Sequence, residues 1–275
     1  MLLRKPLEIH SELAAGIAKG DKAAFREMLD RHKEEVHFLL ARLAGERTAN
    51  ALFIDVFLQT ATVLSHAAMS EEERANSMNL PLKIATSLCD LRLCGAKRAF
   101  KGHRPPPIAN IPYKGEVLRK FISAELSNMK PIEREVLVLS GIRGLKREDI
   151  SDICGLETDE VKAVISRARA KLSERLRAHL GRGTSYHCGD EGRCEVSRYC
   201  TEAEWMFDDF VDVELDWIEK LILLSHLKKC RRCRMVLSDL NDVAIALKQP
   251  ETYSVPRRLV EKAVAAFSDA GDQVS

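Results

Sequence analysis

The chain has 275 residues, of which 45% are hydrophobic and 31% are charged, and its formal net charge is +2. This length suggests about two domains with real hydrophobic cores, and the small net charge does not by itself mark a nucleic-acid-binding protein. The N-terminus lacks the apolar core of a signal peptide and no run is long enough to span a membrane, so we expect a cytoplasmic protein without a membrane partner.

The predicted elements are helices, because aromatic residues make up only 5% of the chain and alternating β-branched runs are scarce. Apolar residues recur at helical spacing in residues 12–43 (two helices separated by Gly20-Asp21), 51–64 and 80–100. These helices predict a bundle over residues 10–100. Cys89 and Cys94 have no neighbouring Cys or His, so we expect them to be buried in its core.

A proline-rich segment follows this bundle. Residues 101–113 contain four prolines and a glycine, a composition that excludes a helix and predicts a semi-rigid linker. Beyond it, residues 114–180 are predicted to form a four-helix module, with Pro131 at the first turn of its second helix. Residues 181–185 form a second flexible boundary.

The stretch from Lys146 to Leu176 is typical of two helices joined by a turn. Gly155 supplies the left-handed conformation that ends the first helix, and Thr158 is a suitable N-cap for the second. One face of the second helix is apolar, with Val161, Val164, Ile165, Ala168 and Leu172. The other face is basic and is opposed only by Glu174: Lys162, Arg167, Arg169, Lys171, Arg175 and Arg177.

A basic helix face of this kind suits duplex phosphates, while the first residues of such a helix reach base edges. The stretch therefore predicts a helix-turn-helix that binds DNA. The alternative is an ordinary helical hairpin whose charged face is only solvated.

An acidic segment lies further along the chain. Residues 201–219 contain eight acidic residues and no basic one, together with the apolar side chains of Trp205, Phe207, Phe210 and Trp217. These predict an amphipathic acidic helix rather than a disordered tail, and its charge complements the basic helix. A long helical pattern then covers residues 218–247, and a last short helix begins at Pro256.

A cluster of metal-ligand residues falls in this region. His226, Cys230 and Cys233 are spaced i, i+4 and i+7, which would place one imidazole and two thiols on one face of a helix. Zinc in a closed structural site takes four N or S ligands, so a fourth must come from elsewhere. The upstream candidates are Cys200, which we favour, and Cys194, Cys188 and His187.

We expect structural zinc, because nothing nearby supplies a general base and four ligands leave no open position. Unliganded core cysteines are the alternative. A thioredoxin-like redox site is not expected, because that motif belongs beside a strand in a βαβ unit. The basic residues around Cys230 and Cys233 are expected to lower the pKa of these thiols.

Residues 12–180 resemble a bacterial sigma factor of the extracytoplasmic-function group, in the sigma-70 class. The segment GDKAAFREMLDRHKEEVHFLLARLAGERTANALFIDVFLQT is similar to region two of that family, and LPLKIATSLCDLRLCGAKR stands at the place of its promoter-melting helix. The segment LSNMKPIEREVLVLSGIRGLKREDISDICGLETDEVKAVISRARAKLSERL resembles region four, whose helix-turn-helix reads the upstream promoter element.

This resemblance implies binding to core RNA polymerase and recognition of promoter DNA. The residues it implies at DNA are Thr158, Lys162 and Ser166 for bases, Arg167, Arg169 and Lys171 for phosphates, and Lys146 at the start of the stretch. Two segments depart from the family pattern. Residues 51–55 read ALFID in place of an acidic-Gln-Glu segment for polymerase binding, and Asn79, Leu80 and Pro81 replace the usual aromatic residues before the melting helix.

Residues 187–247 resemble the zinc-binding anti-sigma domain, which in that family is normally a separate protein. Cys200, the segment FDDFVDVELD, His226, Cys230 and Cys233 match its spacing, which implies that Cys200 is the fourth ligand. Cys188 and Cys194 receive no role. Residues 248–275 would form a C-terminal tail with a short helix.

The sequence thus predicts a sigma factor for promoter-specific initiation, modulated by intramolecular contact with its tethered zinc domain. One alternative is a helix-turn-helix regulator that does not engage polymerase. Another is a module whose zinc domain binds a separate protein. An enzyme is not expected, because no nucleophile with its base, phosphate loop or open metal site is recognisable.

Overall fold

The computed structural model describes residues 6–66, 77–95, 115–142, 145–181, 198–248 and 253–272. Within these ranges the secondary structure consists of helices, with no strand, so the all-α prediction is confirmed. The predicted linker over 101–113 lies outside the described residues, as do His187, Cys188 and Cys194. Among the helices described, none combines the length and the apolar character needed to cross a membrane.

The chain divides into two compact units, each built from segments that are far apart in the sequence. The first unit takes in residues 1–99, 134–161 and 249–275, and the second takes in residues 100–133 and 162–248. Each unit therefore contains segments from more than one of the predicted domains. The boundaries of the predicted domains stay a prediction.

The first unit is a helical bundle with a phenylalanine-rich core. Its helices are α1 (Pro6–Ala18), α2 (Lys22–Ala44), α3 (Glu46–Leu64), η1 (Ser77–Asn79), α5 (Leu80–Gly95), most of α7 (Pro131–Leu139), α8 (Arg147–Cys154) and α14 (Arg257–Asp272). Phe25, Phe53 and Phe57 are fully buried, and Cys89 is buried as predicted. Gly45 joins α2 to α3 at a φ of 85°, a conformation that costs a glycine little.

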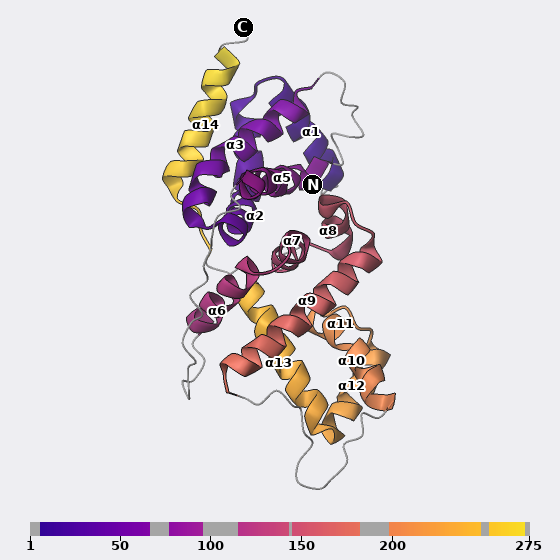
Figure 1. Cartoon of the computed structure of the whole chain (residues 1–275). Coiled ribbons are helices and arrows are strands. Elements are labelled where there is room, and N and C mark those ends of the chain that lie inside the picture. The colour runs from indigo at the N-terminus through magenta and orange to yellow at the C-terminus, as the bar shows by residue number, and fades with distance from the viewer. Residues whose placement is uncertain are drawn as a thin grey trace. The chain divides into compact units, whose positions relative to one another are not determined.

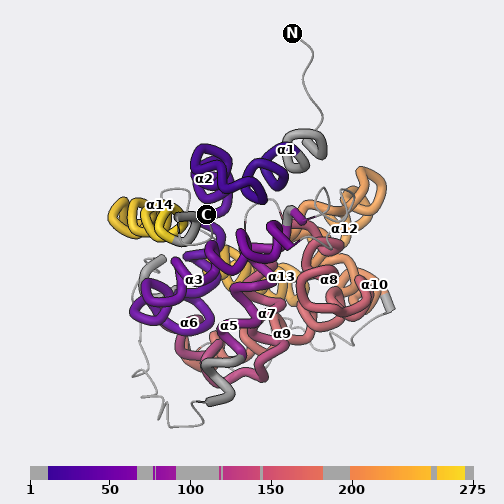
Figure 2. Tube along the Cα trace, turned by 90° about the horizontal axis from the view of Figure 1, so that it is seen from above, coloured from indigo at the N-terminus to yellow at the C-terminus, as the bar shows by residue number. Residues whose placement is uncertain are grey.

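The helix at the C-terminus packs on this bundle. Helix α14 lies along α2 and α3, although more than 190 residues separate it from them in the chain (Figure 1, Figure 2). The ring of Phe267 stacks on Phe25 with a centroid distance of 4.1 Å, and Tyr253 forms a 2.6 Å hydrogen bond with His37. The predicted tail helix is thus an integral part of the first unit.

Helix α8 is also attached to this bundle. Asn79 donates to Asp149 at 3.1 Å, and Lys83 pairs with Asp152 at 2.6 Å. Asp149 also accepts from the backbone N–H of Lys146 at 2.9 Å, which caps the start of α8. These contacts hold the first helix of the predicted helix-turn-helix against η1 and α5.

The second unit joins α6 (Gly115–Ser127) and most of α9 (Thr158–His179) to four helices from the C-terminal part. These are α10 (Arg198–Trp205), α11 (Phe207–Val211), α12 (Trp217–Lys229) and α13 (Arg231–Leu247). Helix α13 packs against α6, and Arg177 of α9 pairs with Asp239 of α13 at 2.7 Å. The ring of His179 stacks on Phe121 at 4.7 Å.

Two helical predictions for the C-terminal part are wrong. Residues 201–219 do not form one helix: they pass through the end of α10, the short α11 and a turn in which Val213 has a φ of 63°. Asp216 then caps α12 by accepting from the N–H of Glu219 at 2.7 Å, so a new helix begins there. The pattern over 218–247 likewise breaks at Cys230, whose backbone is extended.

Candidate nucleic-acid interface and metal centre

The turn between α8 and α9 has the predicted form. Gly155 is left-handed, with φ 66° and ψ 33°, and its N–H donates to the carbonyl of Ser151. Helix α9 begins at Thr158, so the N-cap position falls on Glu157 and the N-cap prediction for Thr158 is wrong by one residue. The N–H of Glu157 donates to the carboxylate of Glu160 at 3.3 Å, which satisfies one backbone donor at this helix end.

The apolar face of α9 is buried as predicted. Its members are Val161, Val164, Ile165, Ala168 and Leu172, to which the structure adds Leu176. This burial fixes the rotation of the helix about its axis, and so it determines which side chains face outward.

The predicted DNA-binding residues differ in their exposure. Those that are exposed are Lys146, Lys162, Arg167 and Lys171, whereas Thr158 and Ser166 are half-buried. Arg169 is the exception, because its side chain is only 2% exposed. Four of the seven predicted residues are therefore exposed to solvent in this structure, although Lys162 and Lys171 also form ion pairs, and Arg169 is buried.

Carboxylates on and just after α11 contact the basic face of α9, all within the second unit. Arg169 forms two parallel hydrogen bonds with Asp212, both at 2.9 Å, and a third with Asp208 at 3.3 Å. Lys162 pairs with Asp209 at 2.8 Å. The fork geometry of Arg169 and Asp212 is the one that guanidinium groups also use to bind phosphate.

Further pairs tie α9 to its neighbours in the second unit. Lys171 pairs with Glu133 at 2.9 Å and Arg175 pairs with Glu125, and in both cases the basic side chain is about half exposed. Exposed pairs of this kind contribute at most about 1 kcal/mol. Arg177 and Asp239 are 7% and 2% exposed, and removing one partner of a buried pair costs about 3–5 kcal/mol.

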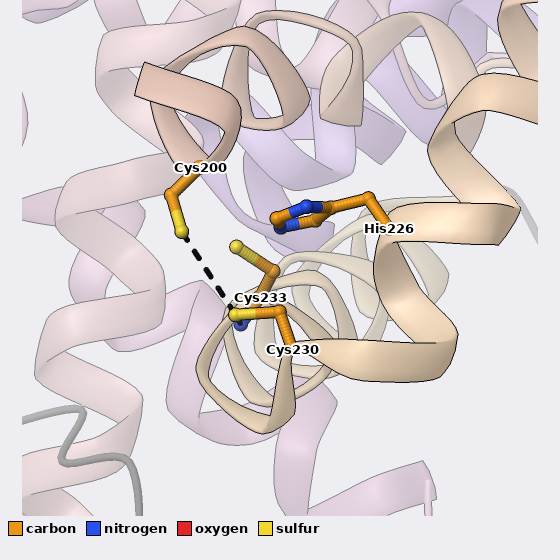
Figure 3. A group of neighbouring side chains, drawn as sticks. All are labelled: Cys200, His226, Cys230 and Cys233. Atoms are coloured by element: carbon orange, nitrogen blue, oxygen red, sulfur yellow. Dashed lines mark hydrogen bonds between the residues drawn. The ribbon is translucent and has the colours of Figure 1, made fainter. Parts of the chain in front are cut away.

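The four predicted metal ligands lie together. One ligand atom from each of Cys200, His226, Cys230 and Cys233 lies within 4.8 Å of the others, and their side chains point toward one another (Figure 3). The prediction that three of them share one helix is wrong. His226 is in the last turn of α12, Cys230 is the junction residue and Cys233 is in the first turn of α13. The break at Cys230 turns the chain so that ligands from two helices converge.

One buried atom tests whether a metal fits here. The Nε2 atom of His226 is buried and has no hydrogen-bond partner among the described residues. Burying an imidazole nitrogen without a partner is unfavourable, and coordination to a cation would satisfy it. The Sγ atoms of Cys200 and Cys230 are 3.9 Å apart, and none of the described cysteines forms a disulfide. One N and three S donors in a buried cluster suit a tetrahedral zinc ion.

The pKa of the Cys233 thiol differs from the expectation. Burial raises the pKa of the Cys233 thiol, and the neighbouring Cys230 and Cys200 raise it further. The basic residues of this region, including Arg232, which pairs with Glu204 at 2.5 Å, do not reverse this effect. A divalent cation would supply the positive charge that stabilises the thiolates.

The core around the cluster is small. Its buried residues are Cys200, Ala203, Phe207, Leu223, Leu227, Cys230, Cys233 and Leu240. Three of these eight are candidate ligands, and the partly buried apolar residues that pack against them are Met206, Phe210, Leu215, Val236 and Leu237. Small cores of this kind commonly depend on a bound metal.

Several contact residues were not singled out from the sequence. The acidic segment was recognised as a whole, but nothing in its spacing showed that Asp208, Asp209 and Asp212 would share a cluster of contacts. Asp239 lies within an ordinary helical pattern, and only the structure shows that it is buried beside Arg177.

A helix, a left-handed glycine turn and a second helix with a basic face define a candidate DNA-binding module. A family model of sigma-70 region 4 matches residues 122–172, which include this whole turn. The chain is also 27% identical over 182 residues to the ECF RNA polymerase sigma factor SigM of Mycobacterium tuberculosis strain Erdman, covering 64% of this chain and 88% of that protein. The SigM sequence of strain H37Rv gives 27% identity over 181 residues. These similarities support the prediction of an ECF sigma factor.

Proposed function

We propose that this chain is an RNA polymerase sigma factor of the extracytoplasmic-function group, which directs promoter-specific initiation in the cytoplasm. The observation that carries this proposal is the region 4 match over residues 122–172, which coincides with the α8–Gly155–α9 geometry. The similarity to SigM extends over 182 residues, well beyond region 4. The partners are core RNA polymerase and promoter DNA, and the chain needs no catalytic activity of its own.

The residues proposed at DNA are those at the start and along the basic face of α9. Thr158, Lys162 and Ser166 would contact bases, and Arg167, Arg169 and Lys171 would contact phosphates, with Lys146 at the start of α8. The exposure of Lys162, Arg167 and Lys171 supports this role. Residues 10–100 and 114–180 would be the two sigma domains.

The metal proposed for the cysteine cluster is zinc in a structural role. Cys200, His226, Cys230 and Cys233 supply a complete set of four ligands, so no position stays open for substrate. When bound, the metal would fix the relative positions of α10, α12 and α13 in the domain proposed over residues 187–247.

The activity would be modulated by this tethered domain. The pairs from Arg169 and Lys162 to the α11 carboxylates support this, because they involve two side chains that the sigma activity would need. Tethering raises the effective concentration of such a contact to about the millimolar range, so a modest intrinsic affinity suffices. Loss of the metal would loosen α10 and α11 and release the basic face.

Transcription on genomic fragments tests the proposal. Core RNA polymerase with the chain should begin transcripts at a small set of promoters that share sequence elements, and core polymerase alone should not. Promoter binding by the chain without association with core polymerase in a pull-down would instead identify a helix-turn-helix regulator. Zinc-dependent capture of a protein partner, with no DNA binding at any salt concentration, would identify an interaction module.

A further inference from the structure

The turn that follows α11 has a strained backbone. Val213 has a φ of 63°, and among the described residues it is the only one other than glycine with a positive φ. In this left-handed region the Cβ atom crowds the following carbonyl oxygen, and a side chain branched at Cβ adds to the crowding. Relative to glycine, valine is disfavoured here by roughly 10-fold. The chain therefore holds Val213 in a conformation that its own side chain opposes.

The backbone, and not the side chain, keeps Val213 in this conformation. The side chain is 83% exposed, so it buries little apolar surface. The N–H of Val213 donates to the carbonyl of Phe210 at 3.2 Å, and the N–H of Glu214 donates to the carbonyl of Asp209 at 2.7 Å. These two bonds are the pair that ends many helices at a left-handed residue, where glycine is the usual residue.

The strained turn is continuous with the carboxylates that contact α9. Helix α11 lies beside α9 within the second unit (Figure 1), and Asp212, directly before Val213, forms two 2.9 Å hydrogen bonds with Arg169. Asp209, whose carbonyl accepts one of the turn's bonds, pairs through its carboxylate with Lys162 at 2.8 Å. The same short segment thus carries both the strain and the contacts with the basic face.

We propose that Val213 is a strained hinge that weakens the hold of α11 on α9. While Arg169 and Lys162 hold the carboxylates in place, the turn stays closed and Val213 stays left-handed. When α11 leaves α9, the turn opens and Val213 returns to the extended backbone that suits a branched side chain. Because the strain is present only in the held state, it lowers the free energy needed for release. This inference rests on the proposed function, since it concerns how firmly the tethered domain holds the DNA-binding helix.

The contacts that hold α11 are otherwise strong. The Arg169 side chain is 2% exposed, and its forked bonds to Asp212 are charge-assisted, which makes each about twice as strong as a neutral hydrogen bond. Tethering keeps the carboxylates at a high local concentration. With a relaxed turn, DNA would rarely displace α11. The strain at Val213 favours release without removing any of the carboxylates.

Two variants at this position separate strain from side-chain contacts. Val213→Gly removes the strain and keeps every carboxylate, so it should make release of α11 about 10-fold rarer. Val213→Ala is the matched control, because it removes the exposed methyl groups and keeps the Cβ atom that crowds the carbonyl oxygen. Its effect should be much smaller than that of Val213→Gly.

Hydrogen exchange and amine labelling of the zinc-loaded full chain measure the two parts of the proposal. Exchange at the amides of α11 reports opening of the turn, and it should be about 10-fold slower in Val213→Gly. Acetylation of Lys162 reports release from α9, because the paired ammonium must first leave Asp209. Relative to the exposed Lys220, labelling of Lys162 should slow by a similar factor.

The double variant Asp208→Asn, Asp212→Asn shows whether the strain acts through the contacts with α9. Labelling of Lys162 should be faster in this variant than in the wild type, because α11 is held less firmly. Adding Val213→Gly to the double variant should then change the labelling rate little. An undiminished effect of Val213→Gly in this background would contradict the hinge.

Two further results would overturn the proposal. Equal exchange of α11 in the wild type and in Val213→Gly would show that the turn stores no strain. Slower exchange with unchanged labelling of Lys162 would show that the strain does not oppose the contact with α9.

Promoter affinity separates the hinge from the proposed function, since neither exchange nor labelling uses DNA or polymerase. Val213→Gly should bind promoter DNA about 10-fold more weakly than the wild type, because release of the basic face becomes rarer by that factor. If no variant binds promoter DNA while exchange and labelling change as expected, the result contradicts the proposed function and supports the hinge.

Discussion

At the scale of single residues, His226 gives the strongest structural argument for a metal. Its buried Nε2 atom has no hydrogen-bond partner among the described residues, and a nitrogen of its ring lies within 4.8 Å of three thiols. The spacing of His226, Cys230 and Cys233 correctly indicated that their side chains would lie close together. Spacing alone could not show that the chain turns at Cys230, because helical periodicity continues through that residue in the sequence.

Metal content is the first prediction at this scale. The purified chain should contain about one zinc ion, and Cys230→Ser should lose most of it, because a hydroxyl is a poor zinc ligand beside thiolates. Metal analysis after gel filtration measures this. Cys154→Ser is the control, since Cys154 is half-buried outside the cluster and should leave the zinc content unchanged. Equal zinc in the wild type and in Cys230→Ser would remove the metal site.

Tyr253 provides a prediction about alkaline pH. Burial raises the pKa of Tyr253 to about 12, with Glu46 adding to the effect, from an ordinary value of 10.0. A raised pKa means that the protonated tyrosine stabilises the fold below pH 10, and that this contribution is lost as the pH rises toward 12. The neutral phenol also shares a hydrogen bond with His37, worth about 1 kcal/mol.

Tyr253→Phe should therefore cost about 1 kcal/mol of unfolding free energy near neutral pH. The difference between wild type and variant should shrink between pH 10 and 12, because only the wild type has the group that ionises there. Urea unfolding at a series of pH values measures this difference. A difference that stays constant across that range would contradict the assigned burial of Tyr253.

At the scale of elements, α9 shows what a helical pattern can and cannot predict. The positions of its apolar and basic faces followed from residue spacing, since burial of one face of a helix fixes the other. The burial of Arg169 did not follow, because it depends on Asp208 and Asp212, about 40 residues away in the chain. The turn at Val213 was not predicted either, because valine does not favour the left-handed backbone conformation that it adopts there.

Arg167 tests the DNA-binding role of α9 without disturbing the contacts with α11. It is exposed, so Arg167→Ala should leave folding unchanged. The affinity should fall by a similar factor for every DNA sequence. The slope of log affinity against log salt concentration, which is negative, should become less steep by about 1. Fluorescence anisotropy across a salt series measures both quantities. Arg257→Ala is the control, because it removes an exposed cation from α14 and should leave the slope unchanged. An unchanged slope for Arg167→Ala would exclude a phosphate contact of Arg167.

At the scale of the whole chain, the arrangement of segments was the least predictable feature. The sequence indicated successive domains, whereas each compact unit combines early and late segments. Helix α14 was expected as a tail helix, but its packing on α2 and α3 depends on ring contacts such as Phe25 with Phe267. Contacts between distant segments leave no local periodicity, so no spacing rule could reveal them.

The central claim is that a sigma factor has its promoter-reading helix held by its own C-terminal domain. The double variant Asp208→Asn, Asp212→Asn removes both carboxylate charges and keeps similar side-chain shapes. It leaves Arg169 without these two ionic partners. The Arg169 guanidinium should then bind DNA phosphates more readily, because a buried charge without a partner is less stable than a charge paired with a phosphate. Glu204→Gln is the control, because Glu204 pairs with Arg232 and not with α9.

The most direct measurement is promoter-specific transcription by core RNA polymerase with the full-length wild type, the double variant or the control. The double variant should produce about 10-fold more transcript from the same start sites, which corresponds to about 1.4 kcal/mol of released restraint. The control should match the wild type. Equal transcription by the wild type and a zinc-loaded double variant would contradict the restraint, and no promoter-specific transcript from any of the three would contradict the sigma-factor assignment itself.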